Sequence, residues 1–149
     1  MKKKTTNISP EIEQEFLKRY AILSFAFGML LISGIASYYL KYIELKNVAL
    51  ILTSITILAM FIAFARVLML LPKAKYLFWN GNFQDEYLNF LSLKAYKCST
   101  ITAFVIAGLL ILLPTSVDLS GAGLGISILS LMCLAYAIPL LIWLRGDNE

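Results

Sequence analysis

Long apolar blocks alternate with short polar segments along the chain. Four blocks cover residues 20–40, 48–71, 98–113 and 121–144. The first, Tyr20–Leu40, contains no charged residue, and at 1.5 Å per residue roughly 20 residues cross a hydrocarbon core of ~30 Å. The pattern predicts an all-α membrane protein that forms a four-transmembrane-helix bundle in a single domain over residues 1–149.

The polar segment before the first block carries signals for the start of a helix. Ser9 suits the N-cap, Pro10 the first helical position, and Glu11 and Glu13 the first turn. We expect a helix to begin here and to run into the first span. A cleavable signal peptide is the alternative, because Gly34-Ile35-Ala36 has the small residues of a cleavage site.

Lysine and arginine lie unevenly on the two sides of the predicted spans. One side would hold the basic residues before the first block, those around the segment 72–97, and Arg145. The other side would hold only Lys41 and Lys46. Because positive charge accumulates in cytoplasmic segments, we expect both termini and the loop 72–97 in the cytoplasm. The expected location is a multi-pass position in a membrane, with a bacterial inner membrane favoured.

Composition narrows the classes of function. Hydrophobic residues make up 60% of the chain and charged residues 15%, against roughly 45–50% and about 25% in soluble domains. Histidine is absent, and Cys98 and Cys133 lack CxxC spacing, so no catalytic residue, metal ligand or cofactor site is expected. The net charge of +4 is explained by membrane topology, with the lipid bilayer rather than nucleic acid as partner.

The segment 72–97 is the richest in side-chain chemistry. Asn80-Gly81 marks a turn, and Asn82 can cap a following helix whose first turn holds Asp85 and Glu86. Apolar residues then recur at helical spacing from Phe83 onward. This predicts a cytoplasmic amphipathic helix between the second and third spans, which either lies at the interface or extends the third span.

Two interpretations of this segment remain open. It is either an ordinary interfacial anchor or a docking surface for a cytoplasmic protein. The candidate partner-binding residues of the second interpretation are Trp79, Asp85, Glu86 and Tyr87.

The pair Asp85-Glu86, followed by Lys94-Ala95 at the mouth of a span, resembles a pattern in small multi-span bacterial inner-membrane proteins of unknown function. Some of those are encoded beside helix-turn-helix regulators. Tyr87 stands where that pattern usually has an arginine. The resemblance covers about a tenth of the chain, and it implies a regulatory setting rather than a reaction.

Arg66 is the ionisable residue within an apolar block. It lies near Pro72, so its side chain can reach the headgroups from the end of the second span. The alternative is an ion pair with Asp85 or Glu86, which would hold the loop against the bundle.

Small residues at four-residue spacing predict where helices approach closely. Gly121 and Gly125 form a GxxxG pair, and Ser33 and Ser37 repeat the spacing in the first span. Packing within the bundle is the default interpretation. A homo-oligomer formed through the fourth span is the alternative.

Three functions are compatible with these features. The leading hypothesis is a non-enzymatic integral membrane protein that presents cytoplasmic segments to a partner in a regulatory role. The second is a small transporter or channel component acting as an oligomer, for which Thr53, Ser54, Thr56 and Arg66 would supply the polar path. A membrane enzyme is the third and least supported, since clustered acids, His or Cys are lacking. A continuous polar stripe through the spans would favour transport, and a dry interior would favour interaction.

Overall fold

The computed structural model describes residues 9–40, 43–80, 83–112 and 121–146, and within these ranges it is helical almost throughout. Helix α1 spans Pro10–Tyr39 and α2 spans Ile43–Asn80. Helix α3 spans Glu86–Leu112 and α4 spans Gly121–Gly146. All four are long and apolar enough to cross a membrane. The chain is therefore a four-helix protein of the multi-pass membrane type.

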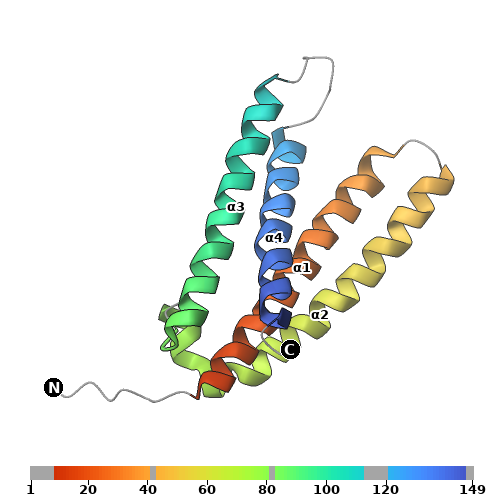
Figure 1. Ribbon diagram of the computed structural model, residues 1–149. Coiled ribbons are helices and arrows are strands. Elements are labelled where there is room, and N and C mark those ends of the chain that lie inside the picture. Colours follow the sequence, from red (N-terminus) through yellow and green to blue (C-terminus); the bar gives the residue numbers. More distant parts are fainter. Residues whose placement is uncertain (1–8, 41–42, 81–82, 113–120, 147–149) are drawn as a thin grey trace.

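The helices pack in the spatial order α2, α1, α4, α3 (Figure 1). Helix α1 contacts both α2 and α4, and α4 contacts α3, so α2 and α3 occupy opposite edges. We call the end with Pro10, Gly146 and the α2–α3 connection the terminal end. The opposite end, where α1 leads to α2 and α3 leads to α4, is the hairpin end (Figure 1).

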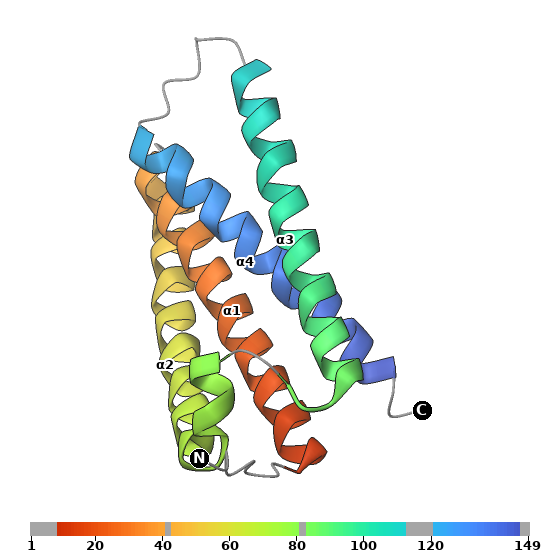
Figure 2. The ribbon, with the colours of Figure 1, turned by 90° about the vertical axis from the view of Figure 1, so that its left-hand side faces the viewer.

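The α1–α2 pair diverges from the α3–α4 pair toward the hairpin end (Figure 1), and α3 also diverges from α4 in that direction (Figure 2). The largest cluster of buried apolar side chains lies near the terminal end, where α1, α3 and α4 meet. Its buried members are Leu17, Ala21, Leu88, Leu91, Ala95, Tyr136, Leu140 and Leu144. A smaller cluster joins Phe16 of α1 to Val67 of α2. The hydrophobic core is thus concentrated in one half of the bundle.

The N-terminal boundary of α1 follows the local sequence. Ser9 is the N-cap residue, with an extended backbone, and Pro10 occupies the first turn. The Ser9 carbonyl accepts hydrogen bonds from the amides of Ile12 and Glu13. Proline suits this position because its missing N–H would have no partner within the helix. The helix-start signals in the sequence are therefore confirmed, and α1 begins ten residues before the first apolar block.

The segment predicted as a loop, 72–97, is mostly helical. Helix α2 continues through Pro72 to Asn80, and residues 86–97 form the first three turns of α3. Residues 86–97 are therefore continuous with the third span and do not form a separate helix, and their amphipathic character at the interface stays a prediction. Asn82, expected as its cap, lies outside the described residues. Pro139 lies inside α4.

Candidate functional site

A buried carboxylate at the terminal end holds the start of α3 against α1. The side chain of Glu13 is fully buried. Its two oxygens accept hydrogen bonds from the backbone amide of Gln84, each at 3.0 Å, and Oε2 also accepts from the amide of Asp85 at 3.0 Å. A helix N-terminus has unpaired N–H groups and a partial positive charge, which favour an anion. Glu13 therefore fixes the α2–α3 connection from 71 residues away.

Asp85 is the N-cap of α3. Its Oδ1 accepts hydrogen bonds from the amides of Tyr87 at 2.8 Å and Leu88 at 3.3 Å. Its carbonyl accepts from the amide of Asn89 at 3.0 Å. An aspartate at this position usually stabilises a helix by about 1 kcal/mol. The carboxylate of Asp85 is therefore bonded within the chain, and Asp85 positions the first turn of α3.

The next two residues of α3 face outward. Glu86 is exposed, and Tyr87 is 48% exposed. Both are carried by the turn that Glu13 and Asp85 hold in place. Trp79, the fourth residue of the predicted docking surface, lies in the last turn of α2, but its side chain is outside the described part of the structure. Of the four candidates, the structure thus brings Asp85, Glu86 and Tyr87 together.

Arg19 joins α1 to α2 near the same end. Its Nε donates to Glu15 Oε1 at 2.7 Å, which is the one ion pair within the described ranges. Its Nη1 donates to the backbone carbonyl of Arg66, also at 2.7 Å. The Arg66 side chain is exposed and forms no ion pair with Asp85 or Glu86 in the described structure. Arg66 therefore contributes to the contact between α1 and α2 through its backbone carbonyl, next to the packing of Phe16 against Val67.

Helices α3 and α4 are joined by polar, aromatic and cation–π contacts, among them a hydrogen bond between Ser92 and Tyr136. Ser99 Oγ donates to the carbonyl of Met132 at 2.9 Å. Lys94 Nζ lies 4.3 Å from the centre of the Trp143 ring. A cation over a tryptophan face is attracted by the negative potential of the ring. These contacts reinforce the half of the bundle that contains the main core.

Two small residues of α1 lie at close contacts between helices. Ser33 was expected there from its spacing with Ser37, and Gly28 was not. Ser33 is buried and lies 3.2 Å from the Thr56 hydroxyl, between α1 and α2. Between α1 and α4, the closest approach is at Gly28, whose carbonyl accepts from Ser130 Oγ at 3.1 Å. A Cβ at Gly28 would lie 3.0 Å from the Leu134 side chain.

The other predicted packing residues lie away from these contacts. Gly121 and Gly125 are exposed, and a Cβ at either would meet nothing within 4 Å. Ser37 is partly exposed, and its hydroxyl donates to the Gly34 carbonyl of its own helix. Homo-oligomer formation through the GxxxG pair remains a prediction.

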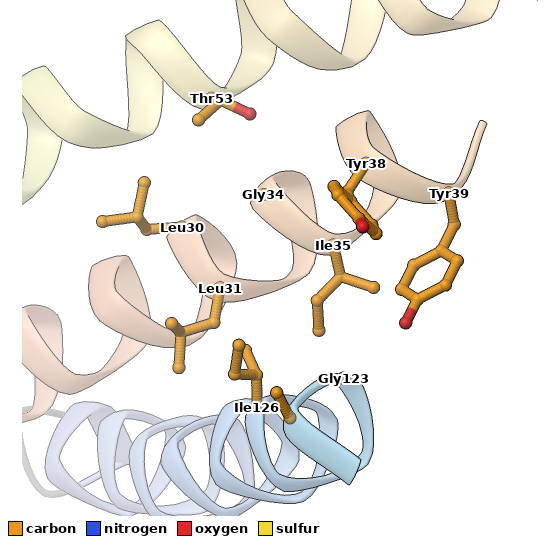
Figure 3. A pocket seen from close by; sticks show the side chains of 10 residues that line it. Leu30, Leu31, Gly34, Ile35, Tyr38, Tyr39, Thr53, Gly123 and Ile126 are labelled. Carbon is orange, nitrogen blue, oxygen red and sulfur yellow. The ribbon is translucent and has the colours of Figure 1, made fainter. Parts of the chain in front are cut away.

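An apolar hollow of about 490 Å³ opens on the side of the bundle near the hairpin end. Leu30, Leu31, Gly34, Ile35, Tyr38 and Tyr39 of α1 form its floor. Thr53 of α2 lines one wall, and the other is the first two turns of α4 (Figure 3). Leu31 and Ile35 extend toward Ile126 of α4 (Figure 3). Sequence reasoning missed this hollow, since apolar side chains that face a cavity look the same as those that face lipid.

Few polar side chains are buried between the described parts of the helices. The charged and hydroxyl side chains among them are Glu13, Ser33, Thr56, Ser92, Ser99 and Ser130, together with the hydroxyl of Tyr136, and no buried side-chain nitrogen or oxygen there lacks a hydrogen-bond partner. Ser92 and Tyr136 belong to a group of hydroxyls with Tyr20 and Tyr96 where α1, α3 and α4 meet. No cluster of three or more His, Cys, Asp or Glu occurs in the described ranges. The buried polar groups of this part of the chain are therefore bonded within the bundle.

Glu13 was recognised from the sequence only as a first-turn acid. Its role was missed, although a signal existed. Glu13 lies at helical spacing with Phe16, Leu17 and Ala21, so it stands on the apolar face of α1. An acid on the buried stripe of a helix requires a hydrogen-bonding partner.

No protein-family model, curated protein or solved structure matches the chain.

Proposed function

We propose that this chain is a non-enzymatic membrane protein whose first turn of α3 docks a cytoplasmic protein. The observation that carries the proposal is the fixed geometry of this turn. Glu13 and Asp85 together bind the amides of residues 84, 85, 87 and 88, which leaves Glu86 and Tyr87 exposed on a rigid support. Rigid presentation favours binding because less conformational entropy is lost when the partner associates.

The orientation belongs to the same proposal. Pro10, Gly146 and the α2–α3 connection share one end of the bundle (Figure 1). The basic residues of the helices toward that end are Lys18, Arg19, Arg66, Lys73, Lys75, Lys94, Lys97 and Arg145. Positive charge favours the cytoplasmic side, so the terminal end, with Glu86 and Tyr87, would face the cytoplasm of a bacterial cell. The resemblance to inner-membrane proteins encoded beside transcription regulators is compatible with a regulatory partner.

Transport by an oligomer is the second candidate function, and the packing of the described residues supports it less. Thr56 is bonded to Ser33 and to the Thr53 carbonyl. Thr53 and Ser54 donate to carbonyls of their own helix. These hydroxyls are used within the chain instead of lining a water-filled path. Interaction is therefore the better supported function.

The test is photo-crosslinking in intact membranes with a benzophenone amino acid in place of Tyr87. We expect an adduct with a specific protein, and we expect Glu86→Lys to abolish it, since reversing a charge at a contact disfavours a complementary partner. Asp85 is kept, because replacing it would disturb the cap itself.

Glu44 offers a matched control. Like Glu86, it is an exposed acid in the first turn of a helix, but it lies at the hairpin end. Glu44→Lys should leave the adduct intact. An adduct that survives Glu86→Lys, or that disappears equally with Glu44→Lys, would overturn the docking proposal.

A further inference from the structure

The hollow near the hairpin end is built along one face of α1. Leu31, Gly34 and Tyr38 follow each other at three- and four-residue spacing, so they form a single stripe. The stripe continues toward the terminal end into a second hollow of about 420 Å³, lined by Tyr20, Ser24 and Phe27 of α1 together with residues of α2 and α4. Helix α1 is thus the floor of a groove whose walls are α2 and α4.

The length of the first hollow matches one leaflet of a bilayer. It extends along α1 from Leu30 to Tyr39, which is about 14 Å at 1.5 Å per residue. Half of a typical hydrocarbon core is about 15 Å. The hollow therefore runs from the membrane interface at the tyrosines to a depth near the bilayer midplane.

Below the tyrosines at its mouth, the lining of the hollow is almost entirely apolar. The hydroxyl of Thr53 is already used, since its Oγ1 donates to the Ala49 carbonyl at 2.7 Å. Ser37 Oγ, next to the hollow, donates to the Gly34 carbonyl at 2.8 Å. The remaining surface is mainly aliphatic, with Gly34 giving it depth because nothing lies within 4 Å of where a Cβ would be. Such a surface fits an alkyl chain better than a polar ligand.

The residues at the mouth of the hollow are of the kind that bind lipid headgroups. Tyr38 is 80% exposed at the end of α1, where tyrosines commonly meet lipid headgroups. Lys46 is exposed and lies seven residues, or two turns, from Thr53, so both project from the same face of α2. An ammonium group at this depth attracts an anionic phosphate.

From the length, the lining and the mouth, we propose that this hollow holds one acyl chain of an anionic phospholipid from the leaflet at the hairpin end. The chain lies against Leu31 and Gly34 of α1, and the phosphate lies near Lys46. This site is separate from the docking turn of α3 and does not depend on it.

The test uses the full chain in vesicles of phosphatidylethanolamine and phosphatidylglycerol. A trace of phosphatidylglycerol carries a diazirine halfway along one acyl chain, and mass spectrometry locates the labelled residues after illumination. We expect Leu31 and Ile126 to be labelled several-fold more than Ile55 and Leu58. Ile55 and Leu58 are exposed on α2 beside Thr56. Thr56 contacts Ser33 of α1, which is two residues from Leu31, so Ile55 and Leu58 lie at a depth in the membrane comparable to that of Leu31.

Filling the hollow should remove this preference. Gly34→Phe is expected to abolish the excess labelling of Leu31 and Ile126 without changing that of Ile55 and Leu58. Gly108→Phe is the matched control, because Gly108 also has open space around it but lies on α3, outside the hollow. Lys46→Gln should lower labelling by the phosphatidylglycerol probe but not by a phosphatidylcholine probe.

Three results would overturn the proposal. The first is equal labelling of the hollow and of α2. The second is a hollow that stays labelled in the Gly34→Phe protein. The third is a covalent dimer formed by a photo-crosslinking residue at position 126, which would place a second copy of the chain there.

Discussion

The two ends of the bundle are built from the same four helices, yet they pack differently. At the terminal end, three helices share a core around Leu17, Leu91 and Leu140, and Glu13 and Arg19 add hydrogen bonds between helices. At the hairpin end, the α1–α2 pair diverges from α3 and α4 (Figure 1), and a hollow lies between the end of α1 and the start of α4. Hydrophobicity alone therefore does not determine where membrane helices meet.

The difference shows what drives helix association in lipid. Lipid tails are as apolar as leucine, so burying an apolar side chain between helices gains little by itself. Close packing and interhelical hydrogen bonds supply the preference instead. The terminal end has both, through Leu140, Glu13 and Arg19. Four substitutions test this account, and each is paired with a control residue.

The largest effect should come from the core of the terminal end. Leu140 is fully buried, and Leu140→Ala should lower the free energy of unfolding by about 2–5 kcal/mol because it leaves a cavity. Ile126, beside the hollow, is 39% exposed, and Ile126→Ala should cost about 0.5 kcal/mol or less. Helicity followed by circular dichroism during SDS titration measures both. Equal losses would contradict the contrast between the two ends.

The next effect should come from the buried carboxylate. Glu13→Ala leaves the amides of Gln84 and Asp85 without this acceptor, which should cost about 1–3 kcal/mol. Hydrogen exchange at these two amides should accelerate with it. Glu11 lies in the same turn but is exposed, so Glu11→Ala should change neither quantity. Unchanged exchange at Gln84 in the Glu13→Ala protein would show that Glu13 does not hold the connection.

An effect of similar size is expected where α1 crosses α4. Valine at Gly28 would bring its Cβ within 3.0 Å of Leu134 and 3.1 Å of the Ser130 carbonyl, and such overpacking typically costs about 1–3 kcal/mol. Gly34 on the same helix has open space, so Gly34→Val should not destabilise the protein. Thermal unfolding in detergent compares the two variants. A Gly34→Val protein as unstable as Gly28→Val would place the tight crossing elsewhere.

The smallest effect should come from the hydroxyl pair between α1 and α2. Ser33→Ala removes the contact with Thr56, and interhelical hydrogen bonds in membranes contribute about 0.6 kcal/mol on average. Ser37 bonds only within its own helix, so Ser37→Ala should have an effect close to zero. The two are compared by the same SDS titration. A larger loss for Ser37 than for Ser33 would contradict the assignment.

The spans were predictable because crossing lipid demands a long apolar run, and hydropathy records this directly. The boundaries were less accurate, as α2 shows by continuing through Pro72. Proline removes one donor and disfavours the preceding turn, but a helix can pass through it when the freed carbonyl finds another partner. A proline therefore marks a weak point in a helix and does not by itself end it.

The candidate site was predictable in part. Asp85 and Glu86 were recognised as first-turn acids, and the structure places both at the start of α3. The sequence did not show that Asp85 would be bonded within the chain while Glu86 is exposed. This difference depends on the contact with Glu13, which is distant in sequence. Gly121 and Gly125 carry the expected spacing but face open space. Spacing shows which residues share a helix face, while the partner of that face depends on how the other helices tilt.

The order of the helices in space has a consequence for how the chain is made. Helix α1 is synthesised first, yet its Gly28 packs against Ser130, 102 residues later. The core at the terminal end is completed by Tyr136, Leu140 and Leu144 of α4. One face of α1 is therefore covered by lipid in the bilayer until α4 has been synthesised. A nascent chain that stops before Tyr136 lacks the side chains that join α1 and α3 to α4.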